Sequence, residues 1–251
     1  MEQKFEEAAK QGFDAVGGGA NPAVVALCKR FGLEYICYTD ANAFTWSERL
    51  EQAVKVSPAR VNVQMCDHDT PPNEAVEVWL KMVERADQLG LNIDLEIHRD
   101  TCTETPEKTY AIADLFQKAT GKPIRFCYDF SHLSVIKHLG APYAPRLLVR
   151  PELIQLARQM HFRPFNGHHC QVPATNGRGE LTPEFNDYLV FVDELLKLWF
   201  AGNPVGETLY ATPENGPVAS GYGLSVFPNV WEDAVVVRNE IDKLWTSHVS
   251  H

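Results

Sequence analysis

The chain contains 251 residues, of which 45% are hydrophobic, and its formal net charge is −10. This acidic balance disfavours a nucleic-acid partner, because phosphate groups attract a positively charged face. No uninterrupted apolar segment approaches the length that spans a bilayer, and the charged N-terminus lacks the pattern of a signal peptide. The six cysteines are scattered without a CxxC pair, which is typical of reduced thiols. We therefore expect a cytoplasmic protein with no membrane partner and one domain over residues 1–251.

Predicted strands and helices alternate along the chain. Strand patterns cover residues 13–16, 34–38, 60–65 and 91–96, and three later strands end near residues 129, 161 and 214. Helical patterns cover residues 5–10, 21–32, 46–56, 72–89, 105–118, 151–158, 182–200 and 229–245. Threonine-proline pairs at Thr70, Thr105 and Thr182 predict where three of these helices begin. The short connections between alternating elements predict a parallel sheet that is covered by helices.

Two α/β architectures fit this alternation, an open sheet and a barrel. An open nucleotide-binding sheet usually has a glycine-rich phosphate turn, but Gly17-Gly18-Gly19 lacks the spaced third glycine. Polar residues instead follow nearly every strand, where a barrel builds its active site. We therefore expect a (β/α)8 TIM barrel. Because only seven strands precede the last helix, three alternatives remain: an extra strand near Gly17, an incomplete barrel, or a gap that a neighbouring subunit fills.

Four strand ends carry acids or histidines, which are Glu96, Asp129, His161 and Glu214. In the first of them, Glu96 and His98 are two residues apart and should point to the same face of a buried strand. Burying such groups is costly unless a metal, a partner or a reaction neutralises them. Three carboxylates and one imidazole suit a hard or borderline divalent ion. Glu214, in the sequence Thr-Pro-Glu, also fits a helix cap.

The motifs at these strand ends are similar to those of a known family. They are Glu96-x-His98, Asp129-x-x-His132, His161-x-Arg163 and a final strand that ends in Glu214. This order resembles the xylose isomerase-like TIM-barrel family, which includes sugar and sugar-phosphate isomerases and epimerases such as the ketose 3-epimerases. The resemblance covers about residues 13–245 and is strongest over residues 91–132.

The resemblance implies a carbohydrate substrate and one divalent metal ion: manganese, magnesium, cobalt or zinc. The implied ligands are Glu96, Asp129, His161 and Glu214, with His168, His169 and Gln171 as alternates to His161. Glu96 and Glu214 are implied as the acid/base pair that moves a proton beside a metal-polarised carbonyl and so forms an ene-diolate. His98, His132 and Arg163 are implied substrate contacts, and His68 faces the same mouth; a salt bridge at Arg163 and a solvated loop at His68 are the alternatives.

Other readings stay open from the sequence. The polar loop over residues 166–179, and Arg99-Asp100-Thr101 where the epimerases have a further acid, leave room for a metal-dependent lyase or dehydratase on a keto-sugar or oxidised glycoside. An apurinic-endonuclease type of barrel would need more metal ligands and a basic face. A non-catalytic carbohydrate-binding or scaffold barrel would not need an intact ligand set. Both a monomer and a homo-oligomer fit the sequence.

Overall fold

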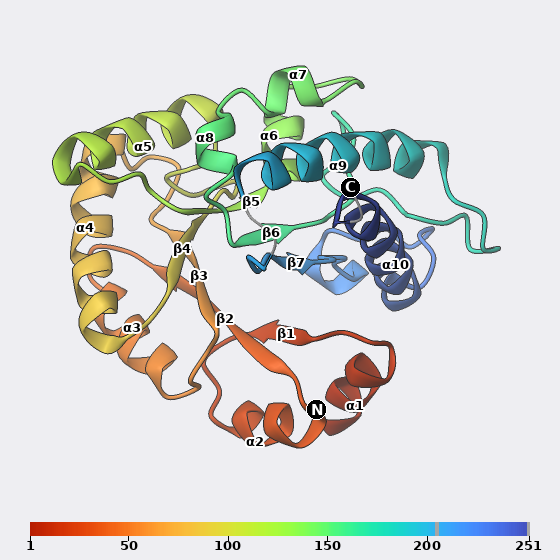
Figure 1. Cartoon of the computed structure of the whole chain (residues 1–251), viewed down its shortest axis with the longest axis horizontal. Coiled ribbons are helices and arrows are strands. Elements are labelled where there is room, and N and C mark those ends of the chain that lie inside the picture. The colour runs from red at the N-terminus through yellow and green to blue at the C-terminus, as the bar shows by residue number, and fades with distance from the viewer. Residues whose placement is uncertain (204–205, 250–251) are drawn as a thin grey trace. The chain divides into compact units, whose positions relative to one another are not determined.

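The computed structural model describes residues 1–203 and 206–249 and divides into two compact units, Met1–Arg125 and Phe126–His251 (Figure 1). Each unit is described separately, and the single domain over the whole chain stays a prediction. No helix of the described ranges has the length and the apolar character needed to cross a bilayer.

The first unit is built on four strands in sequence order, each parallel to the next. The strands are β1 (Ala15–Gly18), β2 (Glu34–Ala41), β3 (Arg60–Met65) and β4 (Ile93–Glu96). The helices are α1 (Glu2–Lys10), α2 (Ala23–Phe31), α3 (Trp46–Val54), α4 (Pro72–Leu89) and α5 (Pro106–Thr120). The predicted alternation of strand and helix is therefore confirmed in this unit.

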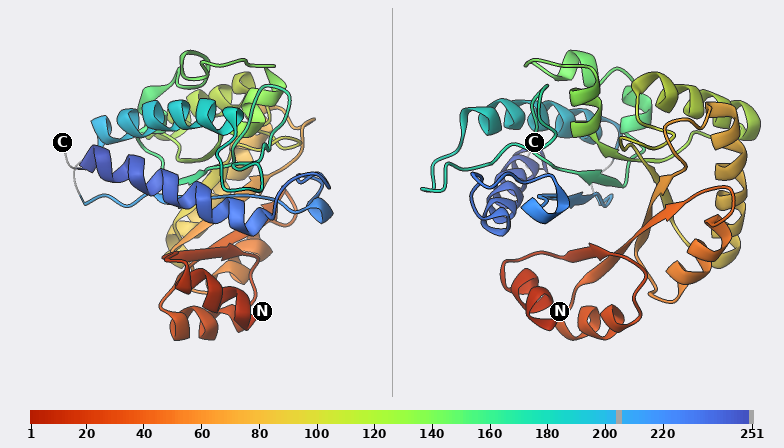
Figure 2. Two further views of the ribbon diagram at one scale, coloured as in Figure 1. Left: turned by 90° about the vertical axis from the view of Figure 1, so that its right-hand side faces the viewer. Right: turned by 180° about the vertical axis from the view of Figure 1, so that it is seen from behind.

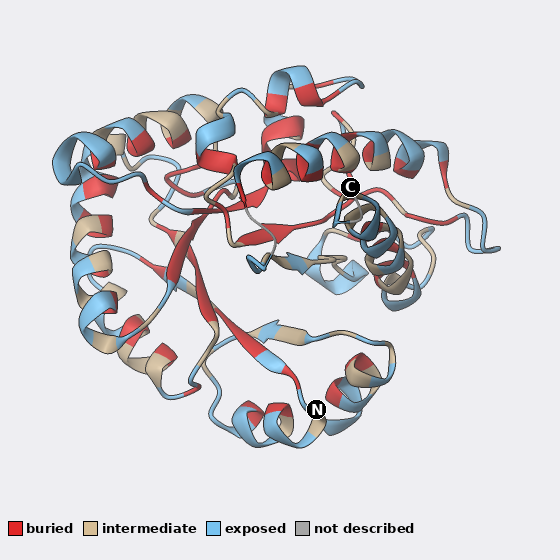
Figure 3. Ribbon diagram, in the orientation of Figure 1, coloured by how far each residue is buried: buried red, intermediate tan, exposed pale blue. Residues whose placement is uncertain are grey.

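The two faces of β3 and β4 differ in polarity, which follows from the period of two along a strand. On one face Val61, Val63 and Leu95 are completely buried. On the other face Arg60 donates two hydrogen bonds to Asp94, at 2.5 and 2.7 Å, and both side chains are buried. Figure 3 shows that burial extends over almost all of both strands. The polar face is the one that leads toward Glu96.

Strand β1 differs from the prediction, because the glycines lie inside it. A Cβ atom on Gly17 would lie 2.4 Å from the ring of Tyr38, and one on Gly18 would lie 2.7 Å from the hydroxyl of Tyr35. These close approaches explain why glycines stand in a strand. The interpretation of Gly17 as part of an extra strand was wrong, and the described residues contain seven strands in all.

The threonine caps of these helices were predicted correctly in two of three cases. The hydroxyls of Thr105 and Thr182 accept hydrogen bonds from the backbone N–H of Lys108 and Phe185, as N-caps do. Thr70 does not cap α4, which has Pro71 at this position without a side-chain cap. Its hydroxyl instead donates a 2.7 Å hydrogen bond to Asp67, so it stabilises the preceding turn.

The second unit has three strands in sequence order, β5 (Phe126–Asp129), β6 (Gln159–His161) and β7 (Tyr210–Thr212), again all parallel. Its helices are α6 (Phe130–Ile136), α7 (Ala144–Leu147), α8 (Pro151–Ile154), α9 (Pro183–Gly202), the 3-10 turn η1 (Val218–Ser220) and α10 (Val230–Val249). Helix α8 is one turn long, so the predicted helix over residues 151–158 was too long. Figure 2 shows α9 (teal to blue) and α10 (dark blue) side by side.

The core of the second unit is aromatic. Phe165 packs edge to face against Tyr143, Tyr188 and Phe191 at ring distances of 5.0 to 5.6 Å. Beside this core, buried Asp233 of α10 accepts hydrogen bonds from the backbone of Ala174 and from the backbone and hydroxyl of Thr175. These bonds attach the long loop before α9 to α10.

Candidate functional site

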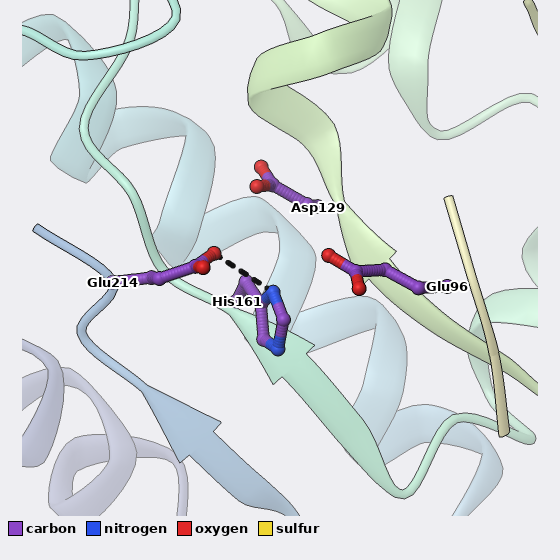
Figure 4. A group of neighbouring side chains, drawn as sticks. All are labelled: Glu96, Asp129, His161 and Glu214. Atoms are coloured by element: carbon purple, nitrogen blue, oxygen red, sulfur yellow. Dashed lines mark ion pairs between the residues drawn. The ribbon is translucent and has the colours of Figure 1, made fainter. Parts of the chain in front are cut away.

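Asp129, His161 and Glu214 come together in the second unit. Strand pairing aligns Asp129 with His161 and His161 with Thr212, so the ends of the three strands lie side by side. One ligand atom of each of the three residues lies within 4.8 Å of the others, and their side chains point toward one another in Figure 4. Nδ1 of His161 lies 2.9 Å from Oε2 of Glu214. The predicted convergence of these strand ends is therefore observed in this unit.

Arg163 joins two of these residues. Its Nη2 donates to Oε2 of Glu214 at 2.6 Å, and its Nε donates to Oδ2 of Asp129 at 3.3 Å. The guanidinium carbon lies 3.9 Å from the centre of the Tyr222 ring, in a cation-π contact. Burial alone would lower the pKa of Arg163, but Asp129 and Glu214 outweigh it and raise the pKa. Arg163 thus stays charged and fixes both carboxylates, as the salt-bridge alternative predicted.

Asp129 is ionised although it is almost completely buried. Burial raises the pKa of a carboxyl group, but the neighbouring His132 and Arg163 hold the pKa of Asp129 well below its ordinary value. Its Oδ1 accepts a hydrogen bond from the backbone N–H of Ser131 at 2.9 Å, so it also begins helix α6. Nε2 of His132 lies 3.3 Å from its Oδ2. A buried, charged carboxylate is the form that a metal ion requires.

Glu214 is not a helix cap. It follows β7, and η1 begins only at Val218. Gln171 fixes the chain just beyond it, because its side-chain amide both donates to the carbonyl oxygen of Gly216 at 2.9 Å and accepts from its N–H at 2.7 Å. Gln171 is therefore engaged with the backbone beside the cluster.

The two loop histidines are placed differently from His161. His168 and His169 are exposed, whereas His161 is 5% exposed. The ring of His168 lies 5.5 Å from that of His138, and Nδ1 of His169 lies 3.1 Å from Oδ1 of Asn166. The histidine in the metal-compatible group is His161, which favours it over the alternates.

Glu96, the fourth residue labelled in Figure 4, belongs to the first unit and ends β4. It is completely buried, and its Oε2 accepts a 2.6 Å hydrogen bond from Nδ2 of Asn62 on β3. Glu96 and Asn62 also form part of the wall of a cavity of about 370 Å³ in this unit. This burial, hydrogen bond and cavity are what a functional carboxylate would show.

His98 and His68 lie beyond the strands of the first unit. Nδ1 of His98 lies 2.6 Å from the carbonyl oxygen of Arg99. His68 is exposed, and its Nδ1 lies 2.7 Å from Oδ1 of Asp100. This hydrogen bond raises the pKa of His68. Their roles in binding substrate stay predictions.

Sequence reasoning missed Asn62 and Tyr222. The sequence does contain a sign of Asn62, because the polar residues Arg60, Asn62 and Gln64 alternate with apolar ones in a strand that is almost entirely buried. Tyr222 had none, since it lies in the irregular segment after η1 and reaches Arg163 only through the folded chain.

Comparison with known proteins gives structural matches only: no family model and no curated protein matches the sequence. A D-tagatose 3-epimerase-like protein is 15% identical, with a TM-score of 0.63 over 97% of this chain and 94% of that one. A probable 3-DHS dehydratase from Bacillus anthracis is 15% identical, with a TM-score of 0.58 over 96% and 92%. A xylose isomerase-like TIM barrel protein from Mycobacterium smegmatis, in complex with magnesium, is 13% identical, with a TM-score of 0.58 over 97% and 89%. The chain therefore has the fold of the xylose isomerase-like TIM barrels.

Proposed function

We propose that this protein is a divalent-metal-dependent isomerase or epimerase of a sugar or sugar phosphate. The observation that carries the proposal is the group formed by Asp129, His161 and Glu214, two carboxylates and an imidazole at the ends of neighbouring strands. The structural matches include a D-tagatose 3-epimerase-like protein and a barrel of the same fold in complex with magnesium, which supports the choice of reaction class.

The residues present fit a single divalent ion. Asp129 is ionised, and the group offers oxygen and imidazole donors of the kind that magnesium, manganese, cobalt and zinc accept. We propose Glu96 as the fourth ligand, since it ends the strand that precedes β5 in the sequence and is buried against Asn62. A bound ion would supply Lewis-acid polarisation of a substrate carbonyl or hydroxyl oxygen.

Proton transfer is assigned to Glu96 and Glu214. One carboxylate takes the proton from the carbon beside the carbonyl, the C–H electron pair moves into an ene-diolate, and a carboxylic acid returns a proton to carbon. Asn62 donates a hydrogen bond to Oε2 of Glu96 and so helps to orient this carboxylate. Arg163 and His161 hold Glu214 in place. His132 and His98 are proposed to bind substrate oxygens, and Arg163 to orient Glu214 and contact the substrate.

Metal analysis tests the first step of this proposal. The purified protein is loaded with manganese, desalted and analysed for metal and protein. The variants Asp129→Asn and Glu96→Gln are treated in the same way, with Asp187→Asn, at an exposed position of α9, as the control. We expect about one equivalent in the parent and the control, and a loss of at least about tenfold in affinity for the two site variants. A parent that binds no ion would refute the proposal. Retention of the ion by Glu96→Gln alone would remove only Glu96 from the ligand set.

Exchange of carbon-bound hydrogen tests the reaction. The manganese-loaded protein is incubated in D2O with ketoses and aldoses, free and phosphorylated, and deuterium in the recovered sugars is measured by NMR. We expect deuterium at the carbon beside the carbonyl, and its loss in Glu214→Gln. A loaded protein that exchanges no substrate in the panel would argue against an isomerase.

The second candidate is a metal-dependent lyase or dehydratase at the same site. The structural match to a probable 3-DHS dehydratase favours it, because the same fold is used there for elimination. Both reactions begin with removal of a proton beside a carbonyl. Product analysis separates them, since elimination gives an unsaturated product with loss of water or alcohol, whereas isomerisation conserves composition. The cytoplasmic location, the small-molecule partner and the assembly state stay predictions.

A further inference from the structure

The cavity in the first unit has a size and lining that suit a small polar molecule. Its volume, about 370 Å³, falls within the range of small-molecule sites, about 300–1,000 Å³. Its walls come from the ends of β1 to β4 and from helix α3. Glu96 is one wall residue, so a molecule in this cavity lies against a proposed catalytic carboxylate.

Asn62, one of the residues that line this cavity, has an unsatisfied buried acceptor. The side chain is 2% exposed, and its Nδ2 is used by Glu96. Its Oδ1 is buried and has no hydrogen-bond partner in the part of the chain that the structure describes. Because a buried amide oxygen without a partner is costly, a donor from a ligand is the simplest way to satisfy it. A hydroxyl group is a donor of this kind.

Arg49 supplies the only cationic side chain among the residues that line the cavity. The one hydrogen bond of its side chain within the described residues is long, from Nη1 to Oε1 of Gln52 at 3.3 Å. Its Nε atom is buried without a partner. An arginine guanidinium has five N–H donors arranged to bind a carboxylate or a phosphate in pairs. Most of this capacity is unused.

The acids of the cavity do not account for Arg49. Asp40 and Glu96 line the same space, but neither forms an ion pair with Arg49 in the described residues. Acidic residues outnumber basic ones in the chain, 33 to 23, so the lack of a carboxylate beside Arg49 does not come from a shortage of acids. A guanidinium that faces a polar cavity without such a partner is suited to an anion from outside the chain.

We propose that this cavity binds the anionic end of an open-chain sugar substrate, with a carboxylate or phosphate at Arg49 and a hydroxyl group that donates to Asn62. This inference rests on the proposed function, since it makes Glu96 act on the same molecule. It narrows the substrate class to sugar acids or sugar phosphates. Gln52 and Gln64 also line the cavity, and their side-chain amides could bind further hydroxyl groups of the sugar.

Three six-carbon polyhydroxy compounds with different terminal groups test this inference. D-sorbitol, D-gluconate and D-sorbitol 6-phosphate end in a hydroxyl, a carboxylate and a phosphate, respectively. Each is titrated by calorimetry into metal-free protein, so that binding does not depend on the proposed metal. The variants are Arg49→Met and Arg49→Lys, and Lys55→Met at the exposed end of the same helix is the control for loss of one positive charge.

We expect at least one of the two anions to bind the parent and Lys55→Met at least about tenfold more tightly than sorbitol does. This preference should disappear in Arg49→Met and be partly kept in Arg49→Lys, with folding checked by circular dichroism. A preference for gluconate would indicate sugar acids, and a preference for sorbitol 6-phosphate would indicate sugar phosphates. The inference would be overturned by equal affinity for all three compounds, by no binding of either anion, or by an unchanged preference in Arg49→Met. Metal content of Arg49→Met, measured in parallel, should equal that of the parent, so a failed metal site would be recognised separately.

Discussion

Arg163 donates a 2.6 Å hydrogen bond to Glu214 from a side chain that is itself 1% exposed. The same arginine reaches Asp129, so one guanidinium is shared by both carboxylates. The cluster is therefore held together by a side chain of the protein itself. This relation predicts how the free protein responds when the arginine is removed.

Arg163→Met should lower the free energy of unfolding of the metal-free protein by about 3 kcal/mol, because buried Asp129 loses a charge partner. Arg163→Lys should lose less, since it keeps the charge but not the paired donors. Urea unfolding in EDTA measures both, and Arg146→Met at an exposed position is the control. A loss no larger than that of the control would show that Arg163 does not stabilise the cluster.

Gly167→Ala should destabilise the loop that carries His168 and His169. A Cβ atom at this position would lie 2.0 Å from the carbonyl oxygen of Leu139, so one of two backbone segments must move. We expect a loss of about 1–3 kcal/mol in urea unfolding. Gly140→Ala is the matched control, because a Cβ atom there meets nothing within 4 Å. Equal stability of the two variants would contradict the prediction.

Asp233→Ala should release the loop before α9 from α10. The carboxylate accepts three hydrogen bonds from Ala174 and Thr175, and all three donors would lose their partner. A loss of on the order of 3 kcal/mol is expected, together with faster hydrogen exchange at the two backbone amides. Glu232→Ala, at the exposed neighbouring position, should change neither measurement. If hydrogen exchange at the backbone amides of Ala174 and Thr175 is unchanged in Asp233→Ala, this interpretation is wrong.

Alkaline pH should destabilise the protein through Tyr35. Burial raises the pKa of its hydroxyl from an ordinary 10 to about 12, so the folded state favours the neutral form. The contribution of the neutral Tyr35 hydroxyl to the free energy of unfolding is complete below pH 10 and is lost as the pH rises from 10 to about 12. Tyr35→Phe removes this dependence, and it also removes the hydrogen bond to the carbonyl oxygen of Gly19, at a cost of about 1 kcal/mol at pH 8.

Urea unfolding between pH 8 and 11 measures this difference. The parent should lose stability more steeply than Tyr35→Phe above pH 10. Cys37, whose buried thiol has its pKa raised to about 11, contributes a similar loss from pH 9 upward in both proteins. Identical slopes above pH 10 would show that Tyr35 ionises as easily in the folded state as in the unfolded one.

The strand ends were predictable from the sequence because their signal is local. Asp129 and His161 each end a short buried strand, and parallel strands place such ends together. The start of α5 at Thr105 was predictable for the same reason, since a cap and its partner are three residues apart. What depends on a few neighbouring residues could therefore be derived.

The contacts between distant segments could not be derived in this way. Asn62 reaches Glu96, 34 residues later, only because β3 pairs with β4 in one register. The stacking of Tyr222 on Arg163 joins segments 59 residues apart by their numbering. The same holds for Arg49, which looks like an ordinary surface residue of a helix until the cavity beside it is known.

The double hydrogen bond between Gln171 and the backbone of Gly216 has a mechanical consequence. It couples the histidine-containing loop to the residue two positions after Glu214, so a displacement of one segment is transmitted to the other. Ala174 and Thr175, further along the same loop, are fixed to Asp233 of α10 instead. The loop is thus held at two places, and only the one at Gln171 acts on the backbone beside Glu214.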